Sequence, residues 1–333
     1  MNQLEITDPE RRDIETLLDE MEERYADLGS DAFLDSAPVF AHDLPARIRL
    51  VVNSFRLGKL SGTLRISGHE VDDERIGLTP GHWRDRSPDL PLLREELLLV
   101  LYGSLLGDPF GWVTQQDGHM VHDVLPIRGH EREQLGSSSA ELLTWHTEDA
   151  FHPLRSDYLL FSCLRNADAA LTTIGSVDDL DLVDSVKDVL FEERFFILPD
   201  ESHRPHNNTE GEVDFTAIEE MRSRPDPIAV LFGDPNQPYI RADPYFMRVS
   251  DGDDEAQNAL DHLVKMMDDQ MTDVDLAGGD YFFIDNLRVV HGRKPFKAHY
   301  DGTDRWLKRL NITLDLRKSR ASRASALSRA ISS

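Results

Sequence analysis

The sequence predicts a mainly β protein with helices, built on a double-stranded β-helix (jelly-roll) core that is flanked by the helices. Short apolar runs bounded by turn-forming residues indicate strands at 62–67, 158–163, 229–232 and 281–284. These runs do not alternate regularly with helical segments, which argues against a doubly wound parallel sheet. A closing β fold can also bring distant strands together. Two histidine-containing motifs, at 145–148 and 290–293, lie far apart in this chain, and such a fold can place them side by side.

Four segments show helix signals. The first begins after Thr7 or Asp8, either of which can cap it, and Pro9 suits its first turn. Gly29 lies past its end. Its apolar residues recur at i, i+3, i+4 and i+7, which predicts one buried stripe formed by Ile14, Leu17, Leu18 and Met21. Further helices are expected at 92–106, 179–191 and 255–271.

The chain shows no internal repeat and no clear linker, so we expect a single domain over 1–316. The polar stretch 200–211 is rich in turn formers and is expected to be a lid, because long polar loops in compact domains often cover sites. His203 and His206 of this stretch are expected to be solvated, with extra metal ligands as the alternative. The basic, Ser- and Ala-rich segment 317–333 is predicted to be a flexible tail.

Composition limits the classes of partner. The 333 residues carry a formal net charge of −26, so nucleic acid and anionic membrane surfaces would be repelled. The single cysteine, Cys163, lies in an apolar run and is interpreted as a buried structural thiol. The chain has no apolar run of the roughly 18 residues that a membrane span needs, and no signal-peptide pattern. A cytoplasmic protein that binds a small molecule is expected, and the sequence does not predict its oligomeric state.

Two motifs suggest a metal site. WHTE at 145–148 contains His146 and Glu148, and VHGR at 290–293 contains His291. Two histidines and one carboxylate form the facial triad of non-haem Fe(II) oxygenases, which leaves coordination positions open for a co-substrate and O2. On a strand, the i, i+2 spacing of His146 and Glu148 points both side chains to one face. The alternative is two core histidines beside an unrelated glutamate.

Arg305 lies 14 residues past His291. Arginine binds a carboxylate through two parallel hydrogen bonds that lysine cannot reproduce. The position is therefore suited to anchor a dicarboxylate co-substrate.

The chain resembles the Fe(II)/2-oxoglutarate oxygenases of the clavaminate synthase-like group that hydroxylate free amino acids, and within it the arginine 3-hydroxylases of viomycin biosynthesis. The similarity runs from residue 38 to residue 319. It is carried by PVFAHDLP (38–45), GDPFGWVTQQDG (107–118), DVLPI (123–127), WHTEDAF (145–151), IDN (284–286) and YDGTDRWLKR (300–309).

This resemblance implies roles for the matching positions. His146, Glu148 and His291 would bind Fe(II), and Arg305 with Thr173 would hold 2-oxoglutarate. Gln115 and Glu148 would bind the substrate amino group, and Arg309 its carboxylate, with Arg309 placed beside Arg305 either by one helical turn or by one strand face. The implied reaction uses O2 to hydroxylate the β-carbon of a free basic L-amino acid, with arginine favoured, and releases succinate and CO2. Related halogenases have a small residue at the position of Glu148, so halogenation is disfavoured.

The far end of the substrate pocket departs from the family pattern. Where the arginine hydroxylase has two acids in Asp-Gly-Asp, this chain has Asp243 and then Tyr245. One carboxylate and a phenol can bind a guanidinium through charge, a hydrogen bond and stacking. They could equally suit a cyclic guanidino acid such as enduracididine or capreomycidine, or the ammonium of lysine or ornithine.

Other functions remain open at this point. The same site could desaturate its substrate or hydroxylate it twice. A non-catalytic jelly-roll binding protein, or a protein with a structural Zn2+ site, is the alternative from a different class, although a structural Zn2+ site usually has four protein ligands. Trp145 and Trp306 are expected in the core, and Asp149 is expected to be a structural partner near the metal strand.

Overall fold

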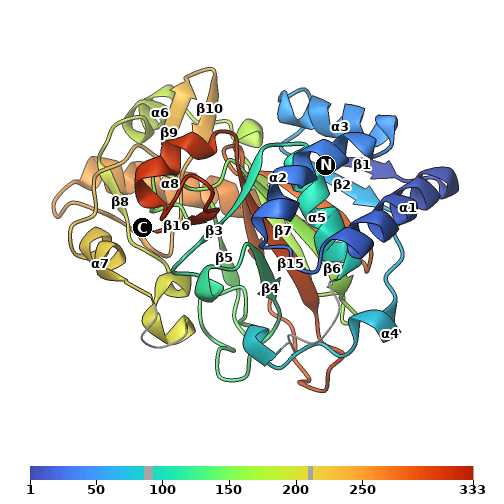
Figure 1. Ribbon diagram of the computed structural model, residues 1–333. Helices are drawn as coiled ribbons and strands as arrows, with labels where there is room; N and C mark the ends of the chain where they lie inside the picture. The colour runs from blue at the N-terminus through green and yellow to red at the C-terminus, as the bar shows by residue number, and fades with distance from the viewer. Residues whose placement is uncertain (86–92, 209–212, 333) are drawn as a thin grey trace.

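The computed structural model describes residues 1–85, 93–208 and 213–332. Two sheets form the centre of the molecule (Figure 1). The larger sheet has the order β1-β2-β13-β6-β15-β3-β16, and β4 also pairs with β15. Its strands are β1 (Asn2–Glu5), β2 (Thr63–Ser67), β3 (Asp108–Trp112), β4 (Val121–Val124), β6 (Tyr158–Arg165), β13 (Tyr281–Asp285), β15 (Trp306–Thr313) and β16 (Ala330–Ile331).

The smaller sheet has the order β12-β7-β14-β5 and is antiparallel throughout. Its strands are β5 (Leu143–His146), β7 (Thr172–Ser176), β12 (Thr272–Val274) and β14 (Val289–Arg293). Two hairpin-like pairs lie outside it: β8 (Phe195–Ile197) with β11 (Met247–Val249), and β9 (Leu231–Asp234) with β10 (Gln237–Ile240). Two facing sheets, each built from strands that lie far apart in the sequence, are consistent with the predicted jelly roll. The described residues contain no doubly wound parallel sheet.

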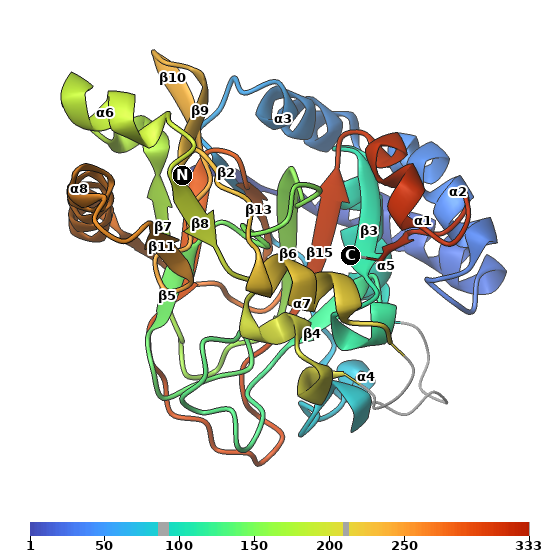
Figure 2. The ribbon, with the colours of Figure 1, turned by 90° about the vertical axis from the view of Figure 1, so that its left-hand side faces the viewer.

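Helices cover the outside of both sheets. Figure 2 shows one group on one side of the strands and α6 and α8 on the other. The first group is α1 (Asp8–Arg24), α2 (Asp31–Phe40), α3 (Ala46–Arg56) and α5 (Arg94–Ser104), whose apolar side chains share a core with β2, β6, β13 and β15. The second is α6 (Asp184–Leu190) and α8 (Asp254–Gln270), which pack over Trp145 and Val290 of the smaller sheet. Shorter helices are α4 (Asp73–Ile76) and α7 (Thr216–Ser223).

Short 3-10 helices connect these elements. Those that form a single turn of three residues are η1 (Ala41–Asp43), η2 (Trp83–Asp85), η3 (Gln116–Gly118), η4 (Val177–Asp179), η5 (Glu201–His203) and η6 (Pro205–Asn207), whereas η7 (Leu316–Ser322) is longer, with seven residues. Two of them, η5 and η6, lie within the stretch 200–211 that the sequence suggested as a lid. Residues 209–211 of that stretch lie outside the described residues.

Most of the predicted elements are present. Helix α1 is capped by Thr7 in a capping box with Glu10, and its buried residues are the four of the predicted stripe. The helix expected at 179–191 is shorter, because 177–179 form a 3-10 turn and α6 begins only at Asp184. The strand expected at 229–232 begins at Leu231. Within the described residues, no helix is long and apolar enough to cross a membrane.

The C-terminal segment differs from the flexible tail that was expected. Ile331 lies in β16, pairs with Trp112 of β3 and is 1% exposed. Arg323 is buried too, and its guanidinium donates to the carbonyl oxygens of Ala326 at 2.9 Å and Ser328 at 2.7 Å. A charge-rich composition does not prevent packing where backbone carbonyls satisfy the charged groups. Ser333 lies outside the described residues.

Candidate active site

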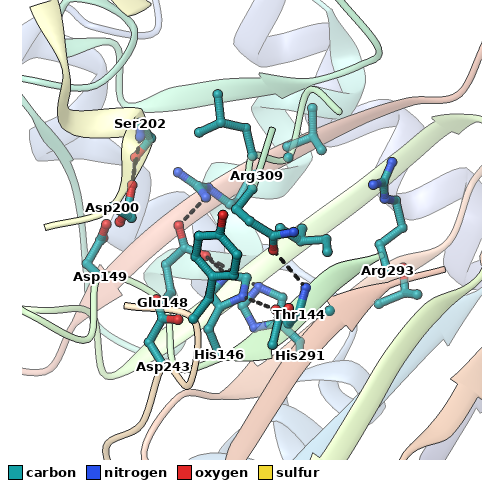
Figure 3. A pocket seen from close by; sticks show the side chains of 18 of the residues that line it. Thr144, His146, Glu148, Asp149, Asp200, Ser202, Asp243, His291, Arg293 and Arg309 are labelled. Atoms are coloured by element: carbon teal, nitrogen blue, oxygen red, sulfur yellow. Dashed lines mark hydrogen bonds and ion pairs between the residues drawn. The ribbon is translucent and has the colours of Figure 1, made fainter. Parts of the chain in front are cut away.

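The two histidines predicted as metal ligands lie opposite each other on neighbouring strands. His146 ends β5, His291 lies in β14, and the antiparallel register pairs one with the other. Oε2 of Glu148 lies 3.7 Å from Nε2 of His146 and 3.3 Å from Nε2 of His291. One ligand atom from each of the three side chains lies within 4.8 Å of the other two. Figure 3 shows the three side chains gathered at one point of the cavity wall.

Hydrogen bonds behind the triad fix its orientation. Nδ1 of His146 donates to the carbonyl oxygen of Thr144 at 2.9 Å, so in the neutral ring Nε2 presents its lone pair to the site. Asn286 holds the turn that carries Glu148: its Oδ1 accepts from the Glu148 amide at 2.9 Å, and its Nδ2 donates to the Glu148 carbonyl at 3.2 Å. Asp149 follows with a φ of 50°, which turns the chain sharply after the ligand.

The charges of the triad suit a divalent cation. Burial alone would raise the pKa of Glu148, but Arg309 and the two imidazoles hold it well below its usual range. Burial and the neighbouring His146 lower the pKa of His291 to about 4, so this ring is neutral. Burial opposes protonation of His146, but Glu148 and Asp243 outweigh it and raise the pKa to about 9. A metal ion therefore has to displace one proton, from His146, to find two imidazole nitrogens and a carboxylate.

Arg305 fits the predicted role of a carboxylate anchor. It immediately precedes β15, is 6% exposed, and lines the same cavity as the triad. Its Nη2 donates to Oγ1 of Thr172 at 3.1 Å, and its buried Nε has no acceptor. Burial lowers the pKa of Arg305 to about 10, and within the described ranges no carboxylate pairs with it. A buried guanidinium without an anion is costly, so the site is suited to a ligand that brings a carboxylate.

The threonine beside Arg305 is Thr172 rather than Thr173. Thr172 lines the cavity, whereas Thr173 does not. The two are successive residues of β7, and successive side chains of a strand point to opposite faces. The structure therefore places Thr172, rather than the predicted Thr173, on the cavity face beside Arg305.

Arg309 lies on β15 with its guanidinium against the triad. The strand face, rather than a helical turn, places it on the same side as Arg305. It pairs with Glu148 and donates to Oε1 of Gln115 at 3.2 Å and Nδ1 of His122 at 2.8 Å. Gln115 is 2% exposed and lies directly behind Arg309 rather than in the cavity wall. His122 was not predicted, since a lone histidine in a short strand carries no signal of its own.

The far part of the cavity carries two acids. Asp243 lines it and is buried, and this burial raises its pKa to about 7 despite the nearby His146. Tyr245 also lines it but is 60% exposed, so it lies at the mouth. Asp200 is a further lining residue that the sequence reasoning placed in the lid without a role. The signal that could have found it is an acid that follows the apolar run 195–198 after a single proline, Pro199.

Other predicted positions have structural roles. Asp149 accepts hydrogen bonds from Trp112 and Gln115 and is thus a partner near the metal strand, as expected. His203 is completely buried, so the expectation of a solvated side chain is wrong for it, while His206 is exposed. Trp145, Trp306 and Cys163 are buried, and burial raises the pKa of the Cys163 thiol to about 12.

A His-x-Glu…His triad in a cavity, with Glu148 and His291 buried and His146 half-buried, beside an arginine without an anion defines a non-haem iron oxygenase that takes a dicarboxylate co-substrate. The chain belongs to the taurine catabolism dioxygenase TauD, TfdA family, whose pattern matches residues 95–311. As the resemblance implied, the protein is an Fe(II)/2-oxoglutarate-dependent dioxygenase of the kind that hydroxylates amino acids.

Three similar proteins support this assignment. The enduracididine beta-hydroxylase of Streptomyces hygroscopicus is 46% identical over 98% of this chain and 99% of its own. The L-ornithine/L-arginine 3-hydroxylase of Catenulispora acidiphila is 43% identical over 96% of this chain and 97% of its own. The non-heme iron oxygenase OrfP, solved with Fe, succinate and (3S)-hydroxy-L-Arg, superposes with a TM-score of 0.96 at 47% identity, over 99% of this chain and all of the other.

Proposed function

We propose that this protein hydroxylates the β-carbon of free L-arginine. The overall reaction consumes the amino acid, 2-oxoglutarate and O2, and it yields 3-hydroxyarginine, succinate and CO2. The observation that carries the proposal is the position of Arg309: a guanidinium for an α-carboxylate lies in contact with the metal-ligand carboxylate Glu148. A substrate gripped by its α-groups at this point would present its β-carbon to the metal.

The residues around Arg309 are suited to bind an amino acid by its two charged α-groups. Arg309 would bind the α-carboxylate, with His122 behind it as a neutral acceptor, because burial and Arg309 hold the pKa of His122 well below its usual range. Glu148 would accept from the α-ammonium group, while Gln115, behind Arg309, would orient the guanidinium through the hydrogen bond that its Oε1 accepts. Both are fixed in place before substrate arrives, which favours a single orientation of the reacting C–H bond.

The co-substrate would occupy the other side of the triad. Arg305 and Thr172 would hold the distal carboxylate of 2-oxoglutarate, and Nε of Arg305 would gain the acceptor that it lacks. The bound iron and 2-oxoglutarate supply the oxidising chemistry, while the protein orients the substrate and excludes water. We interpret the two sheets that enclose this cavity as the double-stranded β-helix of the family.

The acids at the far end favour a cationic side chain. Asp243 and Asp200 would pair with a guanidinium, and Tyr245 at the mouth could stack on it or donate a hydrogen bond. Two substrate classes compete with arginine: cyclic guanidino acids such as enduracididine, the substrate class that one relative's name gives, and ornithine or lysine. Each would use the same α-group contacts and differ only at these three side chains.

Anaerobic reconstitution with Fe(II) and 2-oxoglutarate, followed by air and a panel of free amino acids, tests the proposal. Succinate and product mass are measured together. A gain of one oxygen on arginine, located at the β-carbon, is expected. Turnover only of ornithine, lysine or a cyclic guanidino acid would contradict the choice of arginine and keep the mechanism. Absence of succinate formation with every amino acid would contradict the proposed function.

Tyr245 is the residue at which we expect specificity to be adjustable. Tyr245→Asp adds a second carboxylate near Asp243, and a charged hydrogen bond of this kind contributes about 1.5–3 kcal/mol. Because the second carboxylate can pair with the planar guanidinium, kcat/KM for arginine should rise about tenfold relative to ornithine and to the cyclic acids. Tyr239→Asp, which changes a partly exposed tyrosine that does not line the cavity, is the control. An unchanged preference in Tyr245→Asp would argue against this pocket assignment.

A further inference from the structure

Residues 200–208 contribute two side chains to the cavity wall without forming an α-helix or a strand. Asp200 and Ser202 line the cavity, and Oγ of Ser202 donates to Oδ1 of Asp200 at 2.5 Å. The segment consists of two 3-10 turns, η5 and η6. Figure 3 shows Asp200 and Ser202 beside Asp149, on the side of the cavity that also holds Glu148 and Arg309. A few side chains therefore hold this segment against the cavity.

His203 is the best buried of these side chains. It is 0% exposed, and among residues 200–208 only His203 and Asn208 are buried. Its Nε2 donates to Oδ1 of Asp149 at 3.1 Å, and its Nδ1 accepts from Oγ1 of Thr114 at 2.7 Å. Both ring nitrogens are thus satisfied. These two polar contacts hold the segment, and both are lost if the side chain leaves its pocket.

Aromatic rings complete the pocket around His203. The imidazole makes edge contacts with Phe151 at 4.9 Å and Trp112 at 5.8 Å between ring centroids. Asn208 provides a second attachment, because its Nδ2 donates to the Thr114 carbonyl at 2.6 Å. The segment is therefore attached at two points to the strand end that precedes Gln115.

Asp149 connects His203 to the side chains that are proposed to bind the α-groups of the substrate. The same carboxylate that accepts from His203 also accepts from Nε1 of Trp112 at 2.6 Å and from Nε2 of Gln115 at 3.0 Å. Gln115 in turn accepts from Arg309 at 3.2 Å and donates to Oγ of Ser202 at 2.6 Å. One buried network thus joins residues 200–208, Asp149 next to Glu148, and the guanidinium of Arg309 that is proposed to bind the substrate α-carboxylate.

We propose that His203 is a positioning residue that latches residues 200–208 closed over the cavity and, through Asp149, ties this closure to the side chains that hold the substrate. The coupling to substrate rests on the function proposed above, whereas the latch itself does not. With the latch released, Asp200 and Ser202 leave the cavity wall and water enters. Gln115 also loses part of the network that orients it toward Arg309. The consequence is weaker substrate binding and, with ascorbate present as the two-electron reductant, conversion of 2-oxoglutarate and O2 to succinate, CO2 and water without hydroxylation.

Two conservative variants separate the two hydrogen bonds of His203. In His203→Gln the terminal amide reaches the position of Nε2 and can still donate to Asp149. In His203→Asn the shorter amide matches Nδ1 and can still accept from Thr114, but it does not reach Asp149. His206→Ala removes an exposed histidine from the same segment and serves as the matched control.

Two measurements follow. Hydrogen exchange of residues 200–208 is measured first on protein without substrate, and then steady-state kinetics with arginine give KM, kcat and the ratio of hydroxylated product to succinate. We expect faster exchange in His203→Asn, a KM raised about tenfold or more, and a lower product-to-succinate ratio. In His203→Gln, the exchange rate, KM and the product-to-succinate ratio should be close to the wild-type values. His206→Ala should match the wild type in all three.

The outcomes distinguish a latch from a merely structural histidine. A structural role would lower stability and the active fraction equally in both variants, and it would leave KM and the product ratio unchanged. Unchanged exchange in His203→Asn would overturn the latch, and equal effects of Asn and Gln would overturn the route through Asp149. If wild-type protein turns over no amino acid, the proposed function fails, while the exchange comparison still decides the latch.

Discussion

His146 shows how one side chain is prepared for metal binding. Its Nδ1 is occupied by the Thr144 carbonyl, so only Nε2 faces Glu148 and His291. We predict that His146→Ala loses iron and turnover, because two ligands do not hold a divalent ion at a buried site. Iron content after desalting and succinate release together check this. His42→Ala, which changes an exposed histidine, is the control, and full turnover in His146→Ala would contradict the triad.

Asp285 leads to a prediction about pH. It is 7% exposed at the end of β13, and burial raises its pKa to about 6, against an ordinary value near 3.9. Between these values the folded state binds more protons than the unfolded state, so this group lowers stability as pH rises from about 4 to 6. Above both pKa values, the full loss of stability caused by this buried carboxylate is present.

Asp285→Asn should therefore gain stability relative to the wild type across that window. An Asn Oδ1 can still accept the hydrogen bond from the Leu287 amide, which is 3.1 Å long in the wild type. The gain should be on the order of 2 kcal/mol at pH 7 and nearly zero at pH 4. Denaturant unfolding at both pH values measures it. An equal gain in the free energy of unfolding at pH 4 and at pH 7 would contradict a pKa of Asp285 that burial raises in the folded protein.

At the scale of single residues, sequence reasoning found what motifs encode and missed what only packing decides. His146, Glu148, His291, Arg305 and Arg309 were predicted, and the structure brings them around one cavity. Thr173 was chosen over Thr172 because a pair of identical residues does not reveal which face of a strand is inside. His203 was expected in solvent because its neighbours in sequence are polar, and its partners Asp149 and Thr114 are 54 and 89 residues away.

At the scale of elements, β15 is the strand that organises the site. Arg305 lies just before it and Arg309 within it, while Lys308, on the other face, is completely buried and pairs with Glu96 at 2.8 Å and with Asp123. A strand whose outer face is held by a buried ion pair has little freedom to twist, which keeps the inner guanidinium groups in place. The sequence did not predict this strand, because Trp-Leu-Lys-Arg-Leu-Asn lacks polar and apolar alternation when both faces are buried.

The elements predicted most accurately were those with periodic apolar stripes and caps. Helix α8 was predicted within one residue at each end, and α1 together with its cap. Helices α2 and α3 were not predicted, since Pro38 inside α2 is a helix-breaking signal and α3 has no side-chain cap. Local signals thus decided success, and tertiary packing formed the elements for which such signals are weak.

The C-terminal strand β16 leads to a prediction at this scale. Ile331 packs against Phe110 and Trp112, and Trp112 donates to Asp149 in the network behind the site. Ile331→Ala should cost about 2–5 kcal/mol of the free energy of unfolding, the usual range for truncating a buried isoleucine to alanine. Leu327→Ala, at an exposed position of the same segment, should cost little. The urea midpoint measures both, and an equally small loss in Ile331→Ala would mean that β16 does not contribute to the folded core.

Over the whole molecule, an acidic protein encloses a cavity with several cationic groups. The net charge is −26, yet Arg293, Arg305 and Arg309 all line the cavity. The buried Nε of all three arginines lacks an acceptor, but Arg293 also donates to the carbonyl oxygens of Ser138 and Glu141, and Arg309 pairs with Glu148. Arg305 donates to the neutral hydroxyl of Thr172 and, within the described residues, pairs with no carboxylate, so it is the cavity arginine best suited to bind an anion. The acidic surface suits a cationic substrate, and the interior suits an anionic co-substrate.

The bond between Arg305 and Thr172 joins the larger sheet to the smaller one, so a ligand bound there should stabilise the whole fold. With Mn(II) in place of iron to prevent turnover, 2-oxoglutarate at about 100 times its Kd should add about 2.7 kcal/mol. For a chain of this size that corresponds to a rise in Tm of several degrees. Arg305→Ala should lose nearly all of the rise, and Arg305→Lys should keep only part, because an ammonium lacks the two-pronged geometry. Arg317→Ala, which removes an exposed arginine, should keep the full rise. If Arg305→Ala also kept it, the co-substrate would be anchored elsewhere, and the unmatched guanidinium between the two sheets would need another anion.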